Sequence, residues 1–388
     1  MTMPPPITAL VGPDIFDGDT THHGAALLIR GERVEGIVPA GSIPRGALVQ
    51  ALGGGLLAPG LVDLQVNGGG GLLLNDDPAP AAMARIAAAH ARLGTTTILP
   101  TLITDTPEHS AAAIAAAQKA VDQGVPGIAG LHLEGPHLSV LRKGAHDGAL
   151  IRPMTGADLD LLTAAARRLP ALMMTLAVES ATPDQIARLT AAGVVISLGH
   201  SEASYDQVQA AVRAGARSAT HLFNAMSPLG NREPGLVGAA LEMGELSAGL
   251  IADGFHVHPA AMRVALRAKR GPGAIYLVSD AMATIGSDLT SFRLNGRPVF
   301  RDKGRLTLAD GTLAGADIDL LSAVRFAVAH LDQTPAEALA RATRIPARLM
   351  GLSDRGHLAN GARADILHLG DDLRLRAGWQ GGQPLVTA

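Results

Sequence analysis

The sequence contains no cysteine among its 388 residues and few aromatic side chains, which make up 2% of the chain. Without cysteine the protein can form no disulfide bond and can use no thiolate in catalysis or metal binding. Any bound metal must therefore take nitrogen and oxygen ligands. Hydrophobic residues still account for 47% of the chain, so the core must be built from Ala, Leu, Val and Ile.

The chain also lacks an excess of charge of one sign and any long apolar run. Its formal net charge is −3 with mixed signs, so no basic face for a nucleic acid is expected. The longest apolar runs are broken by Arg or Gly well short of a membrane span. The first residues, MTMPPPITAL, lack a basic stretch followed by an apolar one, so no signal peptide is expected. We therefore expect a soluble, cytoplasmic protein that binds neither nucleic acid nor membrane.

The two ends of the chain share one pattern. Residues 1–56 contain short β-like runs separated by Gly and Pro, and residues 353–388 have the same composition. Neither end alone supplies enough strands for a stable sheet. Both ends are therefore expected to combine into one small β-sandwich domain, with residues 57–352 forming a second domain between them.

Between the ends, short apolar runs alternate with Ala-rich segments of helical character. The runs are continuously apolar, as expected for parallel strands buried on both faces. The predicted strands are 57–66, 95–102, 127–134, 171–179, 194–200, 218–221, 246–252 and 274–280. The predicted helices include 79–93, 108–123, 184–192, 205–214 and 259–269. This alternation predicts an α/β fold, a TIM-like (β/α)8 barrel.

A doubly wound open sheet is the alternative fold. It would need a Gly-rich phosphate loop after its first strand. The glycine run at 67–71 follows that strand but lacks the spacing of a dinucleotide fingerprint, and it is better explained as a loop that passes close to a site. After the eighth strand, residues 291–313 predict a hairpin insertion, and helices are expected at 318–331, 335–342 and 346–350.

Polar side chains stand at the carboxyl ends of the predicted strands, where a barrel carries its chemistry. Two imidazoles with a carboxylate are a common ligand set for Zn²⁺ or Fe²⁺ that leaves positions open for water. Glu134, His200, His221 and Asp280 lie at four separate strand ends and predict one metal site. The other polar residues at strand ends are Asp63, Gln65, Asn67, Glu179 and Asp253.

The first strand bears on the number of metals. Residues i and i+2 of a strand point the same way, so a His-x-His here would hold a second metal. The chain has Gln65 and Asn67 instead, and neutral amides are poor ligands beside imidazole. None of the four lysines lies at a predicted strand end to bridge two metals. The sequence therefore favours one metal, with Gln65 and Asn67 marking a vestigial second position.

Several motifs together resemble the N-acetylglucosamine-6-phosphate deacetylases of the amidohydrolase superfamily. They run in order from about residue 58 to 315 and read DLQVNGGGG, PTLIT, GLHLEGPHLS with KGAHD, SLGHSEASYDQ, THLFNAMSPLGNREPG, GLIADGFHVHP and LVSDAM. The resemblance implies that Glu134, His200 and His221 bind the metal and that Asp280 is the catalytic acid and base. It implies further that His146 contacts the acetyl carbonyl.

The same resemblance assigns the substrate contacts. It places Asn224, Ala225, Arg232 and His256 around the sugar phosphate, with Arg232 reaching across a homodimer interface. A surface ion pair with Glu233 is the alternative for Arg232. His137 departs from the aromatic or apolar residue of many family members, and it could alter the pocket wall, add a ligand or simply face solvent.

The implied reaction is hydrolysis of N-acetyl-D-glucosamine 6-phosphate to glucosamine 6-phosphate and acetate, with one divalent ion per subunit. Zn²⁺ is the expected ion, while Fe²⁺, Co²⁺ and Mn²⁺ accept the same ligands. The first alternative is the same reaction on N-acetylgalactosamine 6-phosphate. A cyclic-amide hydrolase such as a dihydroorotase is disfavoured by the missing His-x-His and strand-end lysine. A non-catalytic sugar-phosphate sensor is disfavoured because all four strand-end residues are present.

Three other residues are expected to play lesser parts. Lys143 is interpreted as a solvated loop charge rather than a site residue. Asp253 is interpreted as a partner of a ligand-binding residue, and Asp63 as a residue that hydrogen-bonds the loops beneath the metal.

Overall fold

Eight parallel strands form the central sheet of the protein, in a computed structural model that describes residues 5–386. The strand order is β17-β16-β15-β14-β13-β12-β11-β8, and an isolated parallel bridge links Val66, at the end of β8, to Ala281, three residues beyond β17. The sheet therefore closes, which confirms the predicted barrel. Its strands are β8 (Leu61–Val66), β11 (Thr95–Ile103), β12 (Leu131–Glu134), β13 (Leu172–Leu176), β14 (Val195–Leu198), β15 (Ser218–Ala219), β16 (Ser247–Ile251) and β17 (Ile275–Val278).

The barrel strands form where the chain is apolar on both of its faces. Every residue of β8, β11, β12, β13, β16 and β17 is buried. Helices cover such strands on the outside, and packed side chains fill the barrel on the inside. All eight carboxyl ends consequently open on one rim, which is where this fold places its functional groups.

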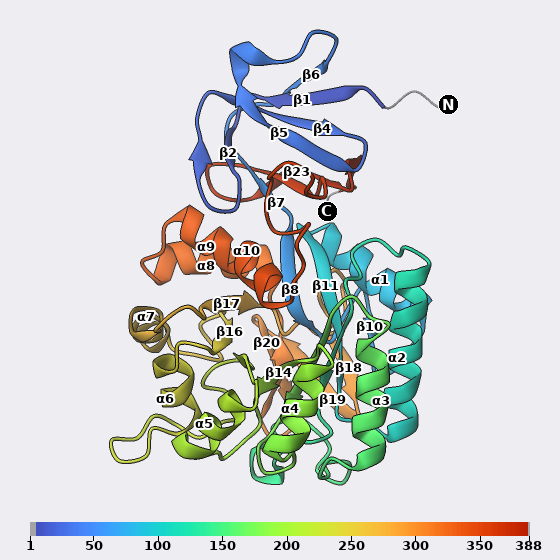
Figure 1. Cartoon of the computed structure of the whole chain (residues 1–388), viewed down its shortest axis with the longest axis vertical. Coiled ribbons are helices and arrows are strands. Elements are labelled where there is room, and N and C mark those ends of the chain that lie inside the picture. The colour runs from blue at the N-terminus through green and yellow to red at the C-terminus, as the bar shows by residue number, and fades with distance from the viewer. Residues whose placement is uncertain (1–4, 387–388) are drawn as a thin grey trace.

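Helices surround the barrel and cover the end of it that faces the terminal sheets (Figure 1). Several begin at capping boxes, such as Thr182 with Gln185 at α4 and Ser204 with Gln207 at α5, in which side chains satisfy the free N–H groups of the first turn. None of the helices within residues 5–386 is long and apolar enough to cross a membrane. They are α1 (Pro80–Ala91), α2 (Pro107–Asp122), α3 (Gly156–Ala166), α4 (Pro183–Ala191), α5 (Tyr205–Arg213), α6 (Gly235–Glu242), α7 (Pro259–Ala268), α8 (Leu320–His330), α9 (Pro335–Ala342) and α10 (Arg344–Leu349).

The two ends of the chain build two further sheets on one common core. One sheet has the order β5-β4-β1-β6, and the other has the order β24-β23-β22-β7-β2-β3, which joins both ends. Their shared core includes Leu10, Ile15, Leu57, Ile366 and Trp379. Figure 1 shows the blue and red segments side by side at one end of the molecule. The predicted pairing of both ends is confirmed, whereas the domain limits at 56/57 and 352/353 stay a prediction.

The strands of these terminal sheets are short. They are β1 (Ile7–Val11), β2 (Asp14–Phe16), β3 (Thr21–His22), β4 (Ala25–Arg30), β5 (Arg33–Pro39), β6 (Leu48–Ala51), β7 (Leu56–Pro59), β22 (Ile366–Leu369), β23 (Leu375–Gln380) and β24 (Gln383–Pro384). A short 3₁₀ turn, η1 (Ala40–Ser42), follows β5. Residues 1–4 and 387–388 of the predicted sandwich lie outside the described range.

The predicted first strand, 57–66, is wrong as a single element. It divides at Gly60 into β7, which pairs with β22 of the terminal sheet, and β8, which enters the barrel. A Cβ atom at Gly60 would lie 2.0 Å from Oγ1 of Thr96, so the chain can pass this point only without a side chain. The continuous apolar run therefore spans two sheets.

The predicted hairpin at 291–313 is a larger insertion of four strands. They are β18 (Ser291–Leu294), β19 (Arg297–Asp302), β20 (Arg305–Leu308) and β21 (Leu313–Ala316), paired in sequence order. The glycine run forms a small ribbon of β9 (Gly68–Gly69) and β10 (Leu72–Leu73). Both elements lie after barrel strands and border the rim that holds the polar residues.

Candidate metal centre and active-site pocket

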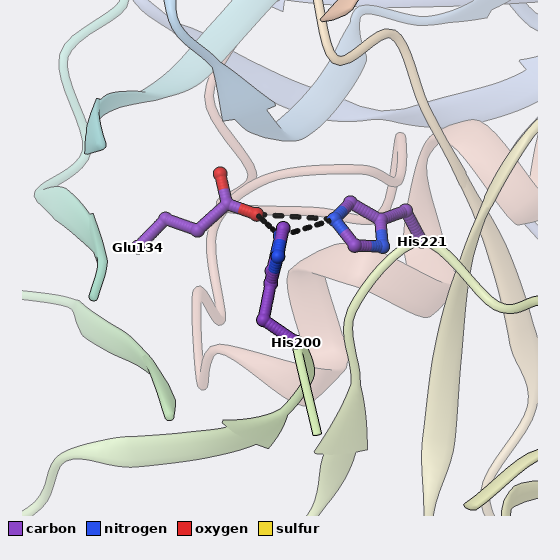
Figure 2. Close-up of side chains that lie close together, drawn as sticks. All are labelled: Glu134, His200 and His221. Carbon is purple, nitrogen blue, oxygen red and sulfur yellow. Dashed lines mark hydrogen bonds and ion pairs between the residues drawn. The ribbon is translucent and has the colours of Figure 1, made fainter. Parts of the chain in front are cut away.

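Two imidazoles and a carboxylate converge at the rim of the barrel. Glu134 is the last residue of β12, while His200 and His221 each lie two residues beyond the ends of β14 and β15. The Nε2 atoms of both histidines are 3.1 Å from the same oxygen, Oε1 of Glu134, and 3.0 Å from each other. Figure 2 shows the three side chains pointing toward one another. All three are buried.

The backbone turns sharply where these residues leave their strands. His200 and His221 have φ angles of 49° and 28°, and Asp280 beyond β17 has a φ angle of 52°. L-residues rarely occupy this left-handed region, and residues held there cluster at functional sites. The turn ends each strand and directs the next side chain over the open end of the barrel.

The donor set of this cluster fits a divalent cation. Nδ1 of His200 lies 2.8 Å from the carbonyl oxygen of Arg142, so Nδ1–H donates there and the Nε2 lone pair faces the cluster. Burial alone would raise the pKa of Glu134, but hydrogen bonds and charge from His200 and His221 hold that pKa well below its usual value. Two nitrogens and one ionised oxygen within 4.8 Å of one another match the ligands that Zn²⁺ and Fe²⁺ take in open sites.

Two amides, one on β8 and one directly after it, each donate to a carboxylate of the site. Nε2 of Gln65 lies 3.2 Å from both Oε1 and Oε2 of Glu134, and Nδ2 of Asn67 lies 2.7 Å from Oδ1 of Asp280. A cation binds an amide through its oxygen, which is a poor ligand for Zn²⁺ or Fe²⁺ beside imidazole. The side chains predicted to mark a vestigial second metal position thus hold the two carboxylates in place.

Asp280 stands beside the cluster without belonging to it. Burial, followed by the negative charge of Glu134, raises the pKa of Asp280 to about 6. Such a carboxylate is ionised at neutral pH yet close enough to its pKa to exchange a proton readily. Its Oδ1 is engaged by Asn67, which leaves Oδ2 for a reacting group.

Asp63 lies deeper in the barrel on the same strand as Gln65. It accepts hydrogen bonds from the backbone N–H groups of Gln65 and Ser279, at 3.2 Å to each. Burial raises the pKa of Asp63 to about 7. The carboxylate ties β8 to the segment that carries Asp280, as the predicted hydrogen-bonding role requires.

His146 is placed to act as a neutral hydrogen-bond donor. Its Nδ1 lies 2.8 Å from Oγ1 of Thr104 and accepts the backbone N–H of the same residue at 3.4 Å, so the proton belongs on Nε2. Burial, reinforced by the charge of His200, lowers the pKa of His146 to about 3. The sequence did not single out Thr104, although its position just beyond β11 was a usable signal.

A pocket of about 250 Å³ opens over the cluster and contains most of the predicted substrate contacts. Asn224, Ala225 and His256 line it together with His146 and Asp280. Nδ1 of His256 lies 2.6 Å from Oδ2 of Asp253, so the carboxylate orients the imidazole and leaves Nε2 free for a ligand. Asp253 was predicted to be the hydrogen-bond partner of a ligand-binding residue, and the residue that it contacts is His256.

Arg232 does not reach this pocket within one chain. It lies exposed on the loop between β15 and α6. Glu233, the predicted ion-pair partner, instead accepts the backbone N–H groups of Tyr205 and Gly235, and the described residues include no ion pair between Arg232 and Glu233. The ion-pair alternative for Arg232 is wrong for the isolated chain.

His137 points away from the cluster. It is buried, its Nδ1 lies 3.1 Å from the carbonyl oxygen of Arg152, and its Nε2 lies 3.9 Å from Asp158. The alternative that it faces solvent is wrong, and it belongs neither to the pocket lining nor to the metal cluster.

Lys143 is exposed, as predicted. Glu179 accepts hydrogen bonds from Ser201 and Glu202, which fixes the loop after His200.

Comparison with known proteins gives consistent matches over most of the chain. A model of the amidohydrolase family matches residues 56–383. An N-acetylgalactosamine-6-phosphate deacetylase of Shewanella sp. (strain ANA-3) is 44% identical over 86% of this chain and 84% of its own length. The N-acetylglucosamine-6-phosphate deacetylase of Haemophilus influenzae is 33% identical over 88% of this chain and 89% of its own length.

A solved structure shows the same fold at comparable identity. It is a variant of the N-acetyl-D-glucosamine-6-phosphate deacetylase of Mycobacterium smegmatis in complex with N-acetyl-D-glucosamine-6-phosphate. It matches with a TM-score of 0.91 and 34% identity, and the match covers 98% of this chain and 100% of that chain. The family match spans every strand-end residue of the pocket.

Proposed function

This chain belongs to the amidohydrolase family, and we propose that it hydrolyses the acetamide of N-acetyl-D-glucosamine 6-phosphate to D-glucosamine 6-phosphate and acetate. One observation carries the proposal, namely the convergence of Glu134, His200 and His221 beside Asp280 at the mouth of the pocket. The similarity to deacetylases that act on N-acetylhexosamine 6-phosphates supports this choice of substrate.

We propose that Glu134, His200 and His221 hold one divalent ion per subunit, most simply Zn²⁺, with Fe²⁺, Co²⁺ and Mn²⁺ accepted by the same donors. Such an ion supplies Lewis acidity for a carbonyl and brings the pKa of a bound water to about 7. Gln65 and Asn67 support a single-ion site because neutral amides are poor ligands beside imidazole, and their nitrogens instead donate to Glu134 and Asp280.

Asp280 is the proposed acid and base. Asn67 holds Oδ1, so Oδ2 takes the proton of the attacking water and then returns it to the departing nitrogen. His146 is the proposed donor to the oxyanion, because Thr104 keeps its proton on Nε2. Burial of both side chains excludes bulk water, which strengthens these interactions.

The phosphate is the reason for proposing a homodimer. None of the described residues that line the pocket is Lys or Arg, although a phosphate dianion calls for charge-assisted donors. His256 and the residues near Asn224 can supply part of the need. We propose that the exposed Arg232 of a second subunit completes the site. Because a charged sugar phosphate does not cross a bilayer unaided, we further propose that the enzyme works in the cytoplasm, in amino-sugar catabolism.

The galacto epimer is a second candidate substrate. The Shewanella relative, at 44% identity, is a deacetylase of N-acetylgalactosamine 6-phosphate. The two substrates differ only in the configuration at C4.

Acetate release from purified, metal-loaded protein tests the proposal. Both 6-phosphates should be compared at matched concentrations, together with N-acetylglucosamine lacking the phosphate and with chelator-treated protein. We expect fast release from one or both phosphates and little from the other two samples. If protein with bound metal released acetate from neither of the two 6-phosphate substrates, the proposed function would be overturned.

A further inference from the structure

One wall of the pocket is apolar and has no part in the chemistry described above. Ile103, Met282 and Leu294 line the pocket and are nearly completely buried, with 6%, 2% and 2% of their surface exposed. They belong to a small hydrophobic cluster with Leu73, Val299, Leu306 and Ala314, separate from the main barrel core.

The insertion of four strands builds most of this wall. Leu294 ends β18, and Val299 and Leu306 behind it come from β19 and β20. The guanidinium of Arg297 donates to the carbonyl oxygen of Ala145, next to His146, so the insertion is tied to the loop that carries the proposed oxyanion donor. Figure 1 shows these strands at the end of the barrel away from the terminal sheets.

The wall extends from Ile103, opposite Asn224 across the barrel mouth, to Met282 and Leu294, which follow β17 beside the strand that precedes His256. Ile103 ends β11 in register with Glu134 of β12, and Met282 follows Asp280 by two residues. Asn224 and His256 follow β15 and β16, and β15 is four strands from β11 in a closed barrel of eight. The cluster of Glu134, His200 and His221 stands between the two sides.

We infer that Ile103, Met282 and Leu294 receive the acyl group of the substrate and set its maximum length. The inference rests on the proposed function. With the phosphate on the side of Asn224 and His256 and the carbonyl oxygen at the cluster and His146, the third substituent of the planar carbonyl carbon is left to face the apolar part of the pocket lining. An acetyl group presents one methyl there, and an apolar surface suits it.

Close packing behind Met282 keeps this wall in place. A Cβ atom at Gly315 would lie 2.4 Å from Cγ and 2.6 Å from the sulfur of Met282, so Gly315 already brings β21 against the side chain. Met282 therefore cannot retreat in that direction when a longer acyl chain enters. A hydrophobic pocket of fixed size distinguishes one methylene by roughly 10- to 200-fold in kcat/KM.

The test is the kcat/KM of metal-loaded protein for the N-acetyl, N-propionyl and N-butyryl forms of glucosamine 6-phosphate. Wild-type protein should prefer acetyl over propionyl by roughly 10-fold or more. Met282→Ala and, independently, Leu294→Ala should raise the ratio of kcat/KM for the propionyl substrate to that for the acetyl substrate roughly 10-fold or more. Each substitution shortens a side chain of the wall and so enlarges the pocket. Met154→Ala is the matched control, since Met154 is buried but does not line the pocket.

The outcomes separate this inference from the proposed function. If wild-type protein releases acetate and both variants fold but keep the wild-type ratio, the acyl wall is refuted while the deacetylase assignment stands. If only one variant folds, its ratio decides the matter. If wild-type protein releases no carboxylic acid from any of the three substrates, the proposed function itself fails.

Discussion

The side-chain amide of Asn67, directly after β8, donates a 2.7 Å hydrogen bond to Oδ1 of Asp280, two residues beyond β17. Gln65, two residues earlier, makes the equivalent contact with Glu134. The first strand thus contributes donors where other arrangements of such a barrel would contribute ligands. Each of the two buried carboxylates thus has its own amide donor, which suits the separate roles proposed for Glu134 as a metal ligand and for Asp280 as the acid and base.

Replacement of Asp280 by Asn should abolish most turnover without loss of metal. The amide keeps the size of the side chain but can neither accept the water's proton nor return it. We expect kcat to fall roughly 10²- to 10⁴-fold. Acetate release and elemental analysis of the same preparation check both halves of the prediction. A variant with near-normal turnover would show that Asp280 is not the base.

The number of metal ions bound per chain should depend on the side chains at positions 65 and 67. Wild-type protein should carry about one divalent ion per chain, because three donors converge at one point. The double variant Gln65→His with Asn67→His places two imidazoles on one face of β8 and should raise the content toward two. The double variant Gln65→Ala with Asn67→Ala is the control and should stay at one. Two tightly held ions in wild-type protein would contradict the single-ion proposal.

Arg232 should act on the pocket of a second subunit. Arg232→Ala should raise KM for the sugar phosphate, whereas the exposed Arg92→Ala should not. Homodimers of Arg232→Ala and of Asp280→Asn should each be poorly active. When the two are mixed through unfolding and refolding, hybrid dimers hold one complete site, so activity should recover to about a quarter of wild type. No recovery in a verified hybrid would place Arg232 outside the site.

Stability should fall with rising pH because of Asp63. Its pKa is raised from 3.8 to about 7 by burial, so the folded chain binds a proton that the unfolded chain releases. The stabilisation is complete below the unfolded pKa and is lost as the pH rises through 7. Asp63→Asn should reduce the loss of unfolding free energy between pH 5 and pH 8 by about 3 kcal/mol.

Denaturant unfolding at several pH values provides the measurement for Asp63. The exposed Asp77→Asn removes a carboxyl group without removing a buried one and serves as the control. Parallel pH profiles for wild type and Asp63→Asn would show that the carboxyl of Asp63 is not held protonated by its surroundings.

The sequence was sufficient to predict the barrel and the residues that converge at its rim. Short, continuously apolar runs that alternate with Ala-rich helices are typical of parallel strands buried on both faces, and polar residues at the carboxyl ends of such strands gather on one rim. That reasoning located Glu134, His200, His221 and Asp280. It did not show that Gln65 and Asn67 donate to those carboxylates, because strand alternation gives the face of a side chain but not its partner across the barrel.

Other features depended on tertiary contacts that have no local signal. Gly60 divides one apolar run between two sheets because Thr96 of a neighbouring strand occupies the space of a side chain. His137 turns away from the cluster because the Arg152 carbonyl accepts its ring N–H. The insertion after β17 was recognised as a hairpin, but its role as a pocket wall followed only from the burial of Leu294.

The pairing of β7 with β22 has a consequence for biosynthesis. β7 leads directly into the barrel, yet its antiparallel partner β22 follows the whole barrel in the sequence and is synthesised after it. Until then, one side of β7 offers free N–H and C=O groups that any other extended segment could capture. The nascent protein is thus open to wrong association after its barrel has been synthesised and before β22 pairs with β7.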